Sequence, residues 1–256
     1  MRRFAMAAGA LLACAACRQH GADTPSSGEV VRVAVAANFA AAQDSLAIRF
    51  RQETGIAVTP IVGATGQLRA QIVYGAPIDV FLAADRATVH SLDTARLTIP
   101  ESHFTYARGT LVLYTPHRSV INTAAALTDT SLHHLAIADP GNAPYGRAAM
   151  EVLNRWKIRA RVEKRLVRGE SVSQTLQFVE SGAADAAFVA LSQVRGRPAD
   201  QYWIVPDSLY TPILQDAVLL VRAGRKDAAQ KYLAYLRSDS ARAIITAFGY
   251  TPGDGK

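Results

Sequence analysis

Cysteine is nearly absent from this chain of 256 residues, since its two cysteines, Cys14 and Cys17, both lie within the first 17 residues. The rest of the chain therefore has neither a disulfide nor a thiol for redox or nucleophilic chemistry. After the N-terminal region, no segment reaches the roughly 20 apolar residues that a transmembrane helix needs. Fixed-period repeats and low-complexity blocks are also missing. These absences argue against a disulfide scaffold, a membrane-spanning protein and a repeat protein.

Signatures of the common catalytic sites are missing as well. The sequence has no G-x-S-x-G elbow, no G-x-x-x-x-G-K-[ST] loop and no histidine pair spaced as in H-E-x-x-H. Asp79 and Asp85 flank the apolar stretch VFLAA, where we interpret them as structural. No catalytic residue, cofactor or metal ion is predicted, and an exported α/β enzyme is the less favoured alternative. We interpret the histidines as exposed polar residues: His20, His90, His103, His117, His133 and His134.

What is present begins with an export signal. MRRFAMAAGALLACAAC (1–17) combines two arginines, a short apolar stretch and small residues, which is typical of a secretory leader rather than a spanning helix. LLAC and CAAC both match a lipoprotein cleavage box, so lipidation at Cys14 or Cys17 and ordinary cleavage nearby are both open. The polar residues 18–29 would serve as a tether. We expect a periplasmic protein, or a membrane-anchored lipoprotein that faces the periplasm.

Lysine and arginine outnumber aspartate and glutamate, 28 to 21, which gives a formal net charge of +7. The basic residues are interpreted as scattered, aromatic residues are few, and the protein is exported, so no nucleic-acid partner is predicted. A merely basic surface explains the charge. A mild positive field that helps a small anion to approach is the second interpretation.

Strand-like and helix-like segments alternate along the rest of the chain. Residues 30–37, VVRVAVAA, predict a buried strand, and residues 38–54 carry apolar side chains at helical spacing. Such alternation predicts an α/β fold with mainly parallel sheets. Two extended stretches, 104–116 and 210–222, are long enough to join two lobes as a two-stranded hinge, with the ligand in the cleft. We predict the following division: signal 1–17, tether 18–29, lobe 1 at 30–108 and 218–256, and lobe 2 at 109–217.

Four strand-to-helix turns are small, polar and uncharged at their centres: AANFA, GATGQ, GNAPYGR and GESVSQ. We predict Asn38, Thr65 and Ser171 as N-cap residues of the helices that follow. Helix N-termini present unpaired N–H groups, and ligands of open α/β sheets bind beside the carboxyl ends of the strands. Each turn alone fits simple capping, but two turns in each lobe predict a shell of donors for a compact oxyanion.

The same turns carry a family resemblance, which runs from about Val31 to Tyr250. AANF, GATGQLRAQI, GAPIDVFLAAD, ADPGNAPYGRAAMEVL and ESVSQTLQFVESGAADAAFV resemble segments of the periplasmic molybdate-binding proteins of ABC importers. This resemblance implies the type II periplasmic binding fold, in which two α/β lobes close on a tetrahedral oxyanion. It implies four ligand residues: Asn38 and Thr65 in one lobe, and the backbone N–H groups of Tyr145 and Val172 in the other.

The resemblance further implies molybdate or tungstate as the ligand, a membrane permease as the partner, no cofactor and a monomer. Thr65 stands where relatives usually have serine, Ala64 replaces a common serine, and Ala190 stands where some relatives place a tyrosine. These departures leave open a binding protein of the same fold for another ligand, such as sulfate, thiosulfate or a small carboxylate. A lining of donors alone would reject hydrogen phosphate, because its O–H would find no acceptor. Arg147 and Arg168 are expected to stay outside the direct ligand contacts.

Overall fold

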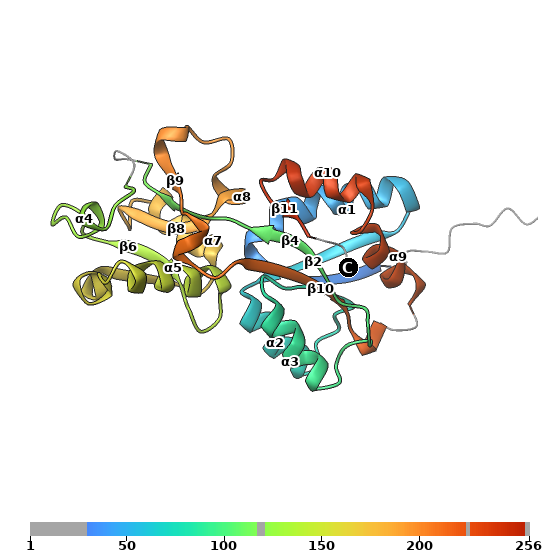
Figure 1. Ribbon diagram of the computed structural model, residues 1–256. Coiled ribbons are helices and arrows are strands. Elements are labelled where there is room, and N and C mark those ends of the chain that lie inside the picture. The colour runs from blue at the N-terminus through green and yellow to red at the C-terminus, as the bar shows by residue number, and fades with distance from the viewer. Residues whose placement is uncertain (1–29, 117–120, 224–225, 254–256) are drawn as a thin grey trace, which may run out of the picture.

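The computed structural model describes residues 30–116, 121–223 and 226–253, which form two neighbouring sheets with helices packed against them (Figure 1). We name the part built on the first sheet lobe 1 and the part built on the second sheet lobe 2. The predicted signal and tether, with Cys14 and Cys17, lie outside the described residues. Within the described residues, no helix is long and apolar enough to cross a membrane.

Lobe 1 is a sheet with helices on both faces. Its strands are β1 (Val30–Ala36), β2 (Ala57–Gly63), β3 (Val80–Leu82), β4 (Phe104–Gly109), β10 (Ile213–Leu219) and β11 (Thr251–Pro252), in the spatial order β11-β4-β10-β3-β1-β2. Val33 and Val35 of β1 pack into one hydrophobic cluster and Ala34 into another, because side chains alternate across a strand. The helices are α1 (Ala40–Thr54), α9 (Asp227–Tyr235) and α10 (Asp239–Ala247) on the first face, and α2 (Thr65–Val73) and α3 (Arg86–Thr94) on the second.

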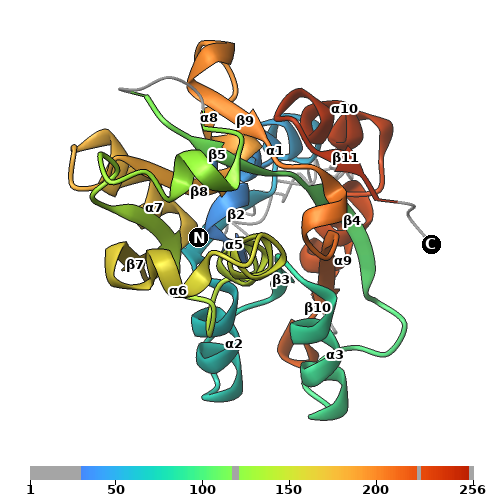
Figure 2. The same ribbon diagram turned by 60° about the vertical axis from the view of Figure 1, so that its left-hand side comes forward.

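Lobe 2 repeats this arrangement on a smaller sheet (Figure 2). Its strands are β5 (Leu111–Tyr114), β6 (Leu135–Ala138), β7 (Leu166–Gly169), β8 (Ala186–Ala190) and β9 (Tyr202–Ile204), in the order β7-β6-β8-β5-β9. Every residue of β6 and β8 is buried, which explains their uninterrupted apolar sequences. The helices are α4 (Ala124–Leu127), α5 (Pro144–Arg155), α6 (Arg159–Val162), α7 (Val172–Glu180) and α8 (Leu191–Val194).

Two segments of the chain connect the lobes. The first runs from β4 of lobe 1 through Thr110 into β5 of lobe 2, and the second returns from β9 into β10. The predicted boundary between residues 217 and 218 falls inside β10. Because β10 pairs with β3 and β4 over Ile213–Leu219, we propose that residues 213–217 belong to lobe 1.

The described part of the chain has the predicted α/β architecture, but its sheets are mixed rather than mainly parallel. β1 is parallel to β2 and β3, and β6 is parallel to β7 and β8. The antiparallel pairs all involve β4, β5 or β10, the strands next to the crossings. A helical crossover makes neighbouring strands parallel, whereas β5 and β10 are entered directly from the other lobe.

Candidate functional site

A small cavity lies between the lobes, where several strands end and the next helices begin. Its volume is about 10 Å³, close to that of one water-sized sphere. Both lobes line it, and no lining side chain carries a charge. The structure brings the four predicted ligand residues together here. The complete lining is Ala36, Ala37, Asn38, Ala64, Thr65, Ala84, Ala143, Pro144, Tyr145 and Val172.

Thr65 is buried at the first position of α2. The N-cap residue is Ala64, so the prediction that Thr65 caps the helix is wrong by one position. The Thr65 hydroxyl instead accepts a hydrogen bond from the backbone N–H of Ala84, at 3.1 Å. Its hydroxyl hydrogen and its backbone N–H, which has no acceptor within the helix, are then two donors beside the cavity.

Asn38 lies in a 3₁₀ turn, Ala37–Phe39, that leads into α1, and its side chain caps neither segment, contrary to the prediction. Its Nδ2 donates to the Gln215 Oε1 at 2.9 Å and to the Tyr250 hydroxyl at 3.0 Å. Both hydrogens of the amide group are therefore used inside the protein. The donor that Asn38 can still offer an anion is its backbone N–H.

The two turns of lobe 2 offer backbone groups. Tyr145 follows Pro144 in the first turn of α5, and the N-cap residue makes no side-chain hydrogen bond. Val172 is the first residue of α7, and Ser171 before it accepts from the Gln174 N–H at 3.3 Å, so its predicted capping role is confirmed. The N–H groups of Tyr145 and Val172 have no intrahelical acceptor and carry the positive end of the helix dipole.

The lobes touch each other around the cavity. The Gly66 N–H of α2 donates to the Asn142 carbonyl oxygen of lobe 2 at 2.9 Å. The Ser173 hydroxyl of α7 donates to the Ala37 carbonyl oxygen of lobe 1 at 3.2 Å. These bonds hold the two lobes against each other beside the cavity, and we refer to this arrangement as closed.

Charged groups lie outside this cavity. Arg147 pairs with Asp85 across the lobes, and Arg168 pairs with Glu163 at 3.1 Å. Neither arginine lines the cavity. Residues 155–168 hold seven basic residues and one acidic residue, a net charge of +6 (7 − 1) out of +7 for the whole chain. The interpretation of the basic residues as scattered is therefore wrong. This segment begins at the end of α5, about 18 Å along the helix from the cavity.

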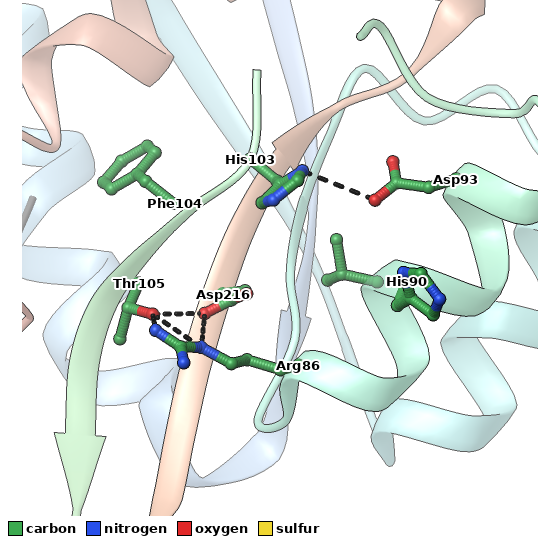
Figure 3. Close-up of a pocket in the computed structure, with 8 residues that line it drawn as sticks. Arg86, His90, Asp93, His103, Phe104, Thr105 and Asp216 are labelled. Atoms are coloured by element: carbon green, nitrogen blue, oxygen red, sulfur yellow. Dashed lines mark hydrogen bonds and ion pairs between the residues drawn. The ribbon is translucent and has the colours of Figure 1, made fainter. Parts of the chain in front are cut away.

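A larger hollow of about 360 Å³ lies on lobe 1 between α3 and the strands β4 and β10 (Figure 3). Most of its polar groups pair with one another. The Thr105 hydroxyl donates to Asp216 at 2.6 Å, and the Arg86 Nη2 donates to the Thr105 oxygen at 2.7 Å. His103 lies 3.4 Å from Asp93. Because these side chains already form hydrogen bonds and ion pairs with one another, we assign no ligand to this hollow.

Other residues singled out in the sequence have structural roles. Asp79 accepts from the Arg32 N–H at 2.9 Å and from the Lys226 Nζ at 2.6 Å, and Asp85 caps α3. No group of three or more histidine, cysteine, aspartate or glutamate residues in the described part is arranged to hold a metal ion. His20 and His117 lie outside the described residues, and the other histidines are exposed as predicted: His90, His103, His133 and His134.

Sequence reasoning missed the residues that hold the Asn38 turn. Gln215 is fully buried, and its Oε1 accepts from Asn38 and from the Tyr106 hydroxyl at 3.0 Å. Tyr250 bonds the same turn from near the end of the chain. One signal was available, since Gln215 and Asp216 interrupt the otherwise apolar stretch ILQDAVLL. A buried glutamine in such a strand needs a hydrogen-bond partner, although the sequence does not say which.

Comparison with known proteins finds relatives that are solute-binding proteins. A family model described as bacterial extracellular solute-binding protein matches residues 31–251. The molybdate-binding protein ModA of Rhodobacter capsulatus is 43% identical over 226 residues, covering 88% of this chain and 89% of that protein. The molybdate-binding protein ModA of Azotobacter vinelandii is 41% identical over 255 residues, covering 98% and 97%.

Solved structures agree with the architecture. The periplasmic molybdate-binding protein of Azotobacter vinelandii matches with a TM-score of 0.82 at 35% identity, over 86% of this chain and 98% of that one. The sulfate-binding protein SubI of Mycobacterium tuberculosis matches with a TM-score of 0.72 at 13% identity, over 88% and 87%. At that identity the second match shows the fold alone. Together with the two sheets, the first match confirms the predicted type II periplasmic binding fold.

Proposed function

Because this chain belongs to the family of bacterial extracellular solute-binding proteins, we propose that it is the substrate-binding component of a molybdate ABC importer. The ligand is molybdate or tungstate, and the partner is the membrane permease of the importer. The protein is a transport component in the periplasm and not an enzyme, and the oxyanion is its ligand rather than a cofactor. A monomer, with lipid attached at Cys14 or Cys17, is part of this proposal.

One observation supports the binding site most strongly: four turns from two lobes meet at one cavity that has no charged lining. We assign five donors to the anion, namely the backbone N–H groups of Asn38, Thr65, Tyr145 and Val172 and the hydroxyl of Thr65. Neutral dipoles at helix N-termini stabilise a compact anion without a counter-ion.

The number of donors is sufficient for useful affinity. A hydrogen bond to a charged group contributes about 1.5–3 kcal/mol, so five contribute roughly 7–15 kcal/mol before the costs of desolvation and lobe closure. A dissociation constant from micromolar to nanomolar corresponds to about 8–12 kcal/mol. Before those costs, the sum overlaps that range without the arginines, which lie outside the cavity.

A thermal-shift screen of the mature protein tests the function. Molybdate or tungstate at a hundredfold excess over the dissociation constant should stabilise the folded state by about 2.7 kcal/mol, which raises Tm by roughly 5–10 °C at this chain length. Sulfate, thiosulfate and phosphate complete the panel. A shift with sulfate or thiosulfate alone would establish the alternative ligand class, and no shift with any anion at millimolar concentration would refute an oxyanion site. Turnover of a phosphorylated or sulfated substrate would favour the alternative of an exported enzyme.

A further inference from the structure

Tyr250 connects the end of the chain to the ligand-facing turn of lobe 1. It follows α10 and Gly249, and its ring packs edge-on against Phe39 with the ring centres 5.1 Å apart. Its hydroxyl donates to the Asn38 carbonyl oxygen at 2.6 Å and accepts from the Asn38 Nδ2 at 3.0 Å. The buried Tyr250 hydroxyl therefore forms hydrogen bonds with both the backbone and the side chain of Asn38.

The same hydroxyl also reaches the other lobe. Ser192 lies in α8 of lobe 2, and its Oγ accepts from the Tyr250 hydroxyl at 2.9 Å, so the single Tyr250 hydrogen is shared between this oxygen and the Asn38 carbonyl oxygen. The Ser192 hydroxyl also lies within donating distance, 2.9 Å, of the Asn38 carbonyl oxygen. Separation of the lobes would break both contacts, whereas the bonds between Tyr250 and Asn38 lie wholly within lobe 1. The contact between Tyr250 and Ser192 is therefore made when the lobes close.

The position of this contact is what connects it to the ligand. Asn38 lines the cavity. Its two amide hydrogens go to Gln215 and Tyr250, and its backbone carbonyl oxygen accepts from Tyr250 and Ser192. The orientation of the Asn38 N–H is then set by side chains behind the turn. Because the turn is already held in this way, less conformational entropy is lost when the anion binds.

We propose that Tyr250 and Ser192 form an interlobe clasp that positions the Asn38 turn and slows the release of the bound oxyanion. Tyr250 is a positioning residue, since it acts on the ligand through Asn38 and does not line the cavity. The inference rests on the proposed function, because the clasp is expected to act on the affinity for an oxyanion. Surface ion pairs such as Arg147 with Asp85 also join the lobes, but exposed pairs contribute little in water.

Two single variants and their combination test the clasp: Tyr250→Phe, which keeps the ring on Phe39, Ser192→Ala, and the double variant. The probe is tungstate, with its dissociation constant measured by calorimetry and its release rate by stopped flow. Each single variant should weaken binding about tenfold, mainly through faster release, because the clasp forms on closure. The double variant should lose less affinity than the product of the two single losses, because both changes remove the shared contact between Tyr250 and Ser192, although each also removes its own bonds to Asn38.

Tyr232→Phe is the matched control. Tyr232 is an equally buried tyrosine of lobe 1, and its hydroxyl donates to the Gln43 Oε1 at 2.6 Å within that lobe. Its loss should lower the Tm of the ligand-free protein and leave the tungstate dissociation constant within twofold of wild type.

Two outcomes separate the clasp from the function on which it rests. Wild-type protein that binds no oxyanion would overturn both proposals. Wild-type binding with Tyr250→Phe and Ser192→Ala unchanged, or with losses that multiply in the double variant, would overturn the clasp alone. If Tyr250→Phe does not fold, Ser192→Ala decides the question, since Ser192 is only half-buried at the lobe surface.

Discussion

Gly66→Ala should have opposite effects on stability and on ligand affinity. A Cβ at Gly66 would lie 2.8 Å from the Asn142 Oδ1 and 3.0 Å from the Asn142 Cα, both in the opposite lobe. The bond from the Gly66 N–H to the Asn142 carbonyl oxygen, at 2.9 Å, lies at the same point of approach. The substitution therefore crowds the closed arrangement, whereas in separated lobes the new methyl group would meet solvent.

The expected magnitudes follow from these two effects. Overpacking costs about 1–3 kcal/mol, so the dissociation constant for tungstate should rise roughly 5–150-fold. Alanine is a better helix former than glycine by about 0.5–1 kcal/mol, so the ligand-free protein should unfold at the same or a slightly higher temperature. Calorimetric titration and thermal melting of the ligand-free protein measure the two quantities separately.

Gly141→Ala serves as the control for Gly66→Ala. Gly141 lies in the facing turn, and the nearest atoms to a Cβ there would be the Asp139 carboxylate oxygens at 3.4–3.5 Å, an ordinary contact. Its dissociation constant should stay within about twofold of wild type. An unchanged affinity in Gly66→Ala would show that the bound state does not bring Gly66 against Asn142, and would refute the closed arrangement as the binding form.

Three further predictions concern the cavity. Thr65→Val removes one donor to the anion and should weaken tungstate binding by about 10–150-fold, whereas Thr65→Ser keeps the hydroxyl and should keep the affinity. If calorimetry gave Thr65→Val the same dissociation constant as Thr65→Ser, the assignment of the Thr65 hydroxyl as a donor would be contradicted. Tyr145→Phe should leave the affinity for tungstate unchanged and the stability equal or higher, because the buried Tyr145 hydroxyl has no hydrogen-bond partner among the described residues. A loss of affinity of more than fivefold would mean that the Tyr145 side chain, and not its backbone N–H, contributes to anion binding. Burial raises the pKa of Tyr145 and Tyr250, so both stay neutral and the affinity for tungstate should be flat from about pH 6 to 9. Tyrosines of the unfolded chain ionise above a pKa of about 10 whereas these two stay protonated in the fold, so the folded state should lose stability as the pH rises above 10, which a melting series at alkaline pH would detect.

Local patterns predicted the elements around the site well. The apolar spacing of Leu46 and Phe50 and the terminating Gly55 match α1, which ends with Gly55 in the left-handed region. The fold class and the four turns follow from such patterns, because strand and helix periods and capping depend on residues a few positions apart. The mixture of parallel and antiparallel strands in each sheet does not follow from local patterns, since it depends on which strands the two crossings between the lobes bring together.

The roles of individual polar residues were less predictable. The sequence predicts the turns that hold Asn38 and Thr65, but the capping roles that it predicts for these two residues are wrong. Asn38 bonds Gln215 and Tyr250, which are 177 and 212 residues away, and Thr65 accepts from Ala84. A polar residue at the start of a helix has a capping propensity that the sequence reveals, but a hydrogen-bond partner from another part of the fold overrides it.

By itself, the sequence determined the alternation of strands and helices and the small, polar turns with uncharged centres at their junctions, because each depends on neighbouring residues. Only the tertiary structure decided that the four turns meet at one cavity, that Gly66 and Asn142 come into contact on closure, and that Tyr250 and Ser192 meet behind Asn38. Contacts between residues so far apart depend on how two lobes pack, and no local pattern encodes that packing.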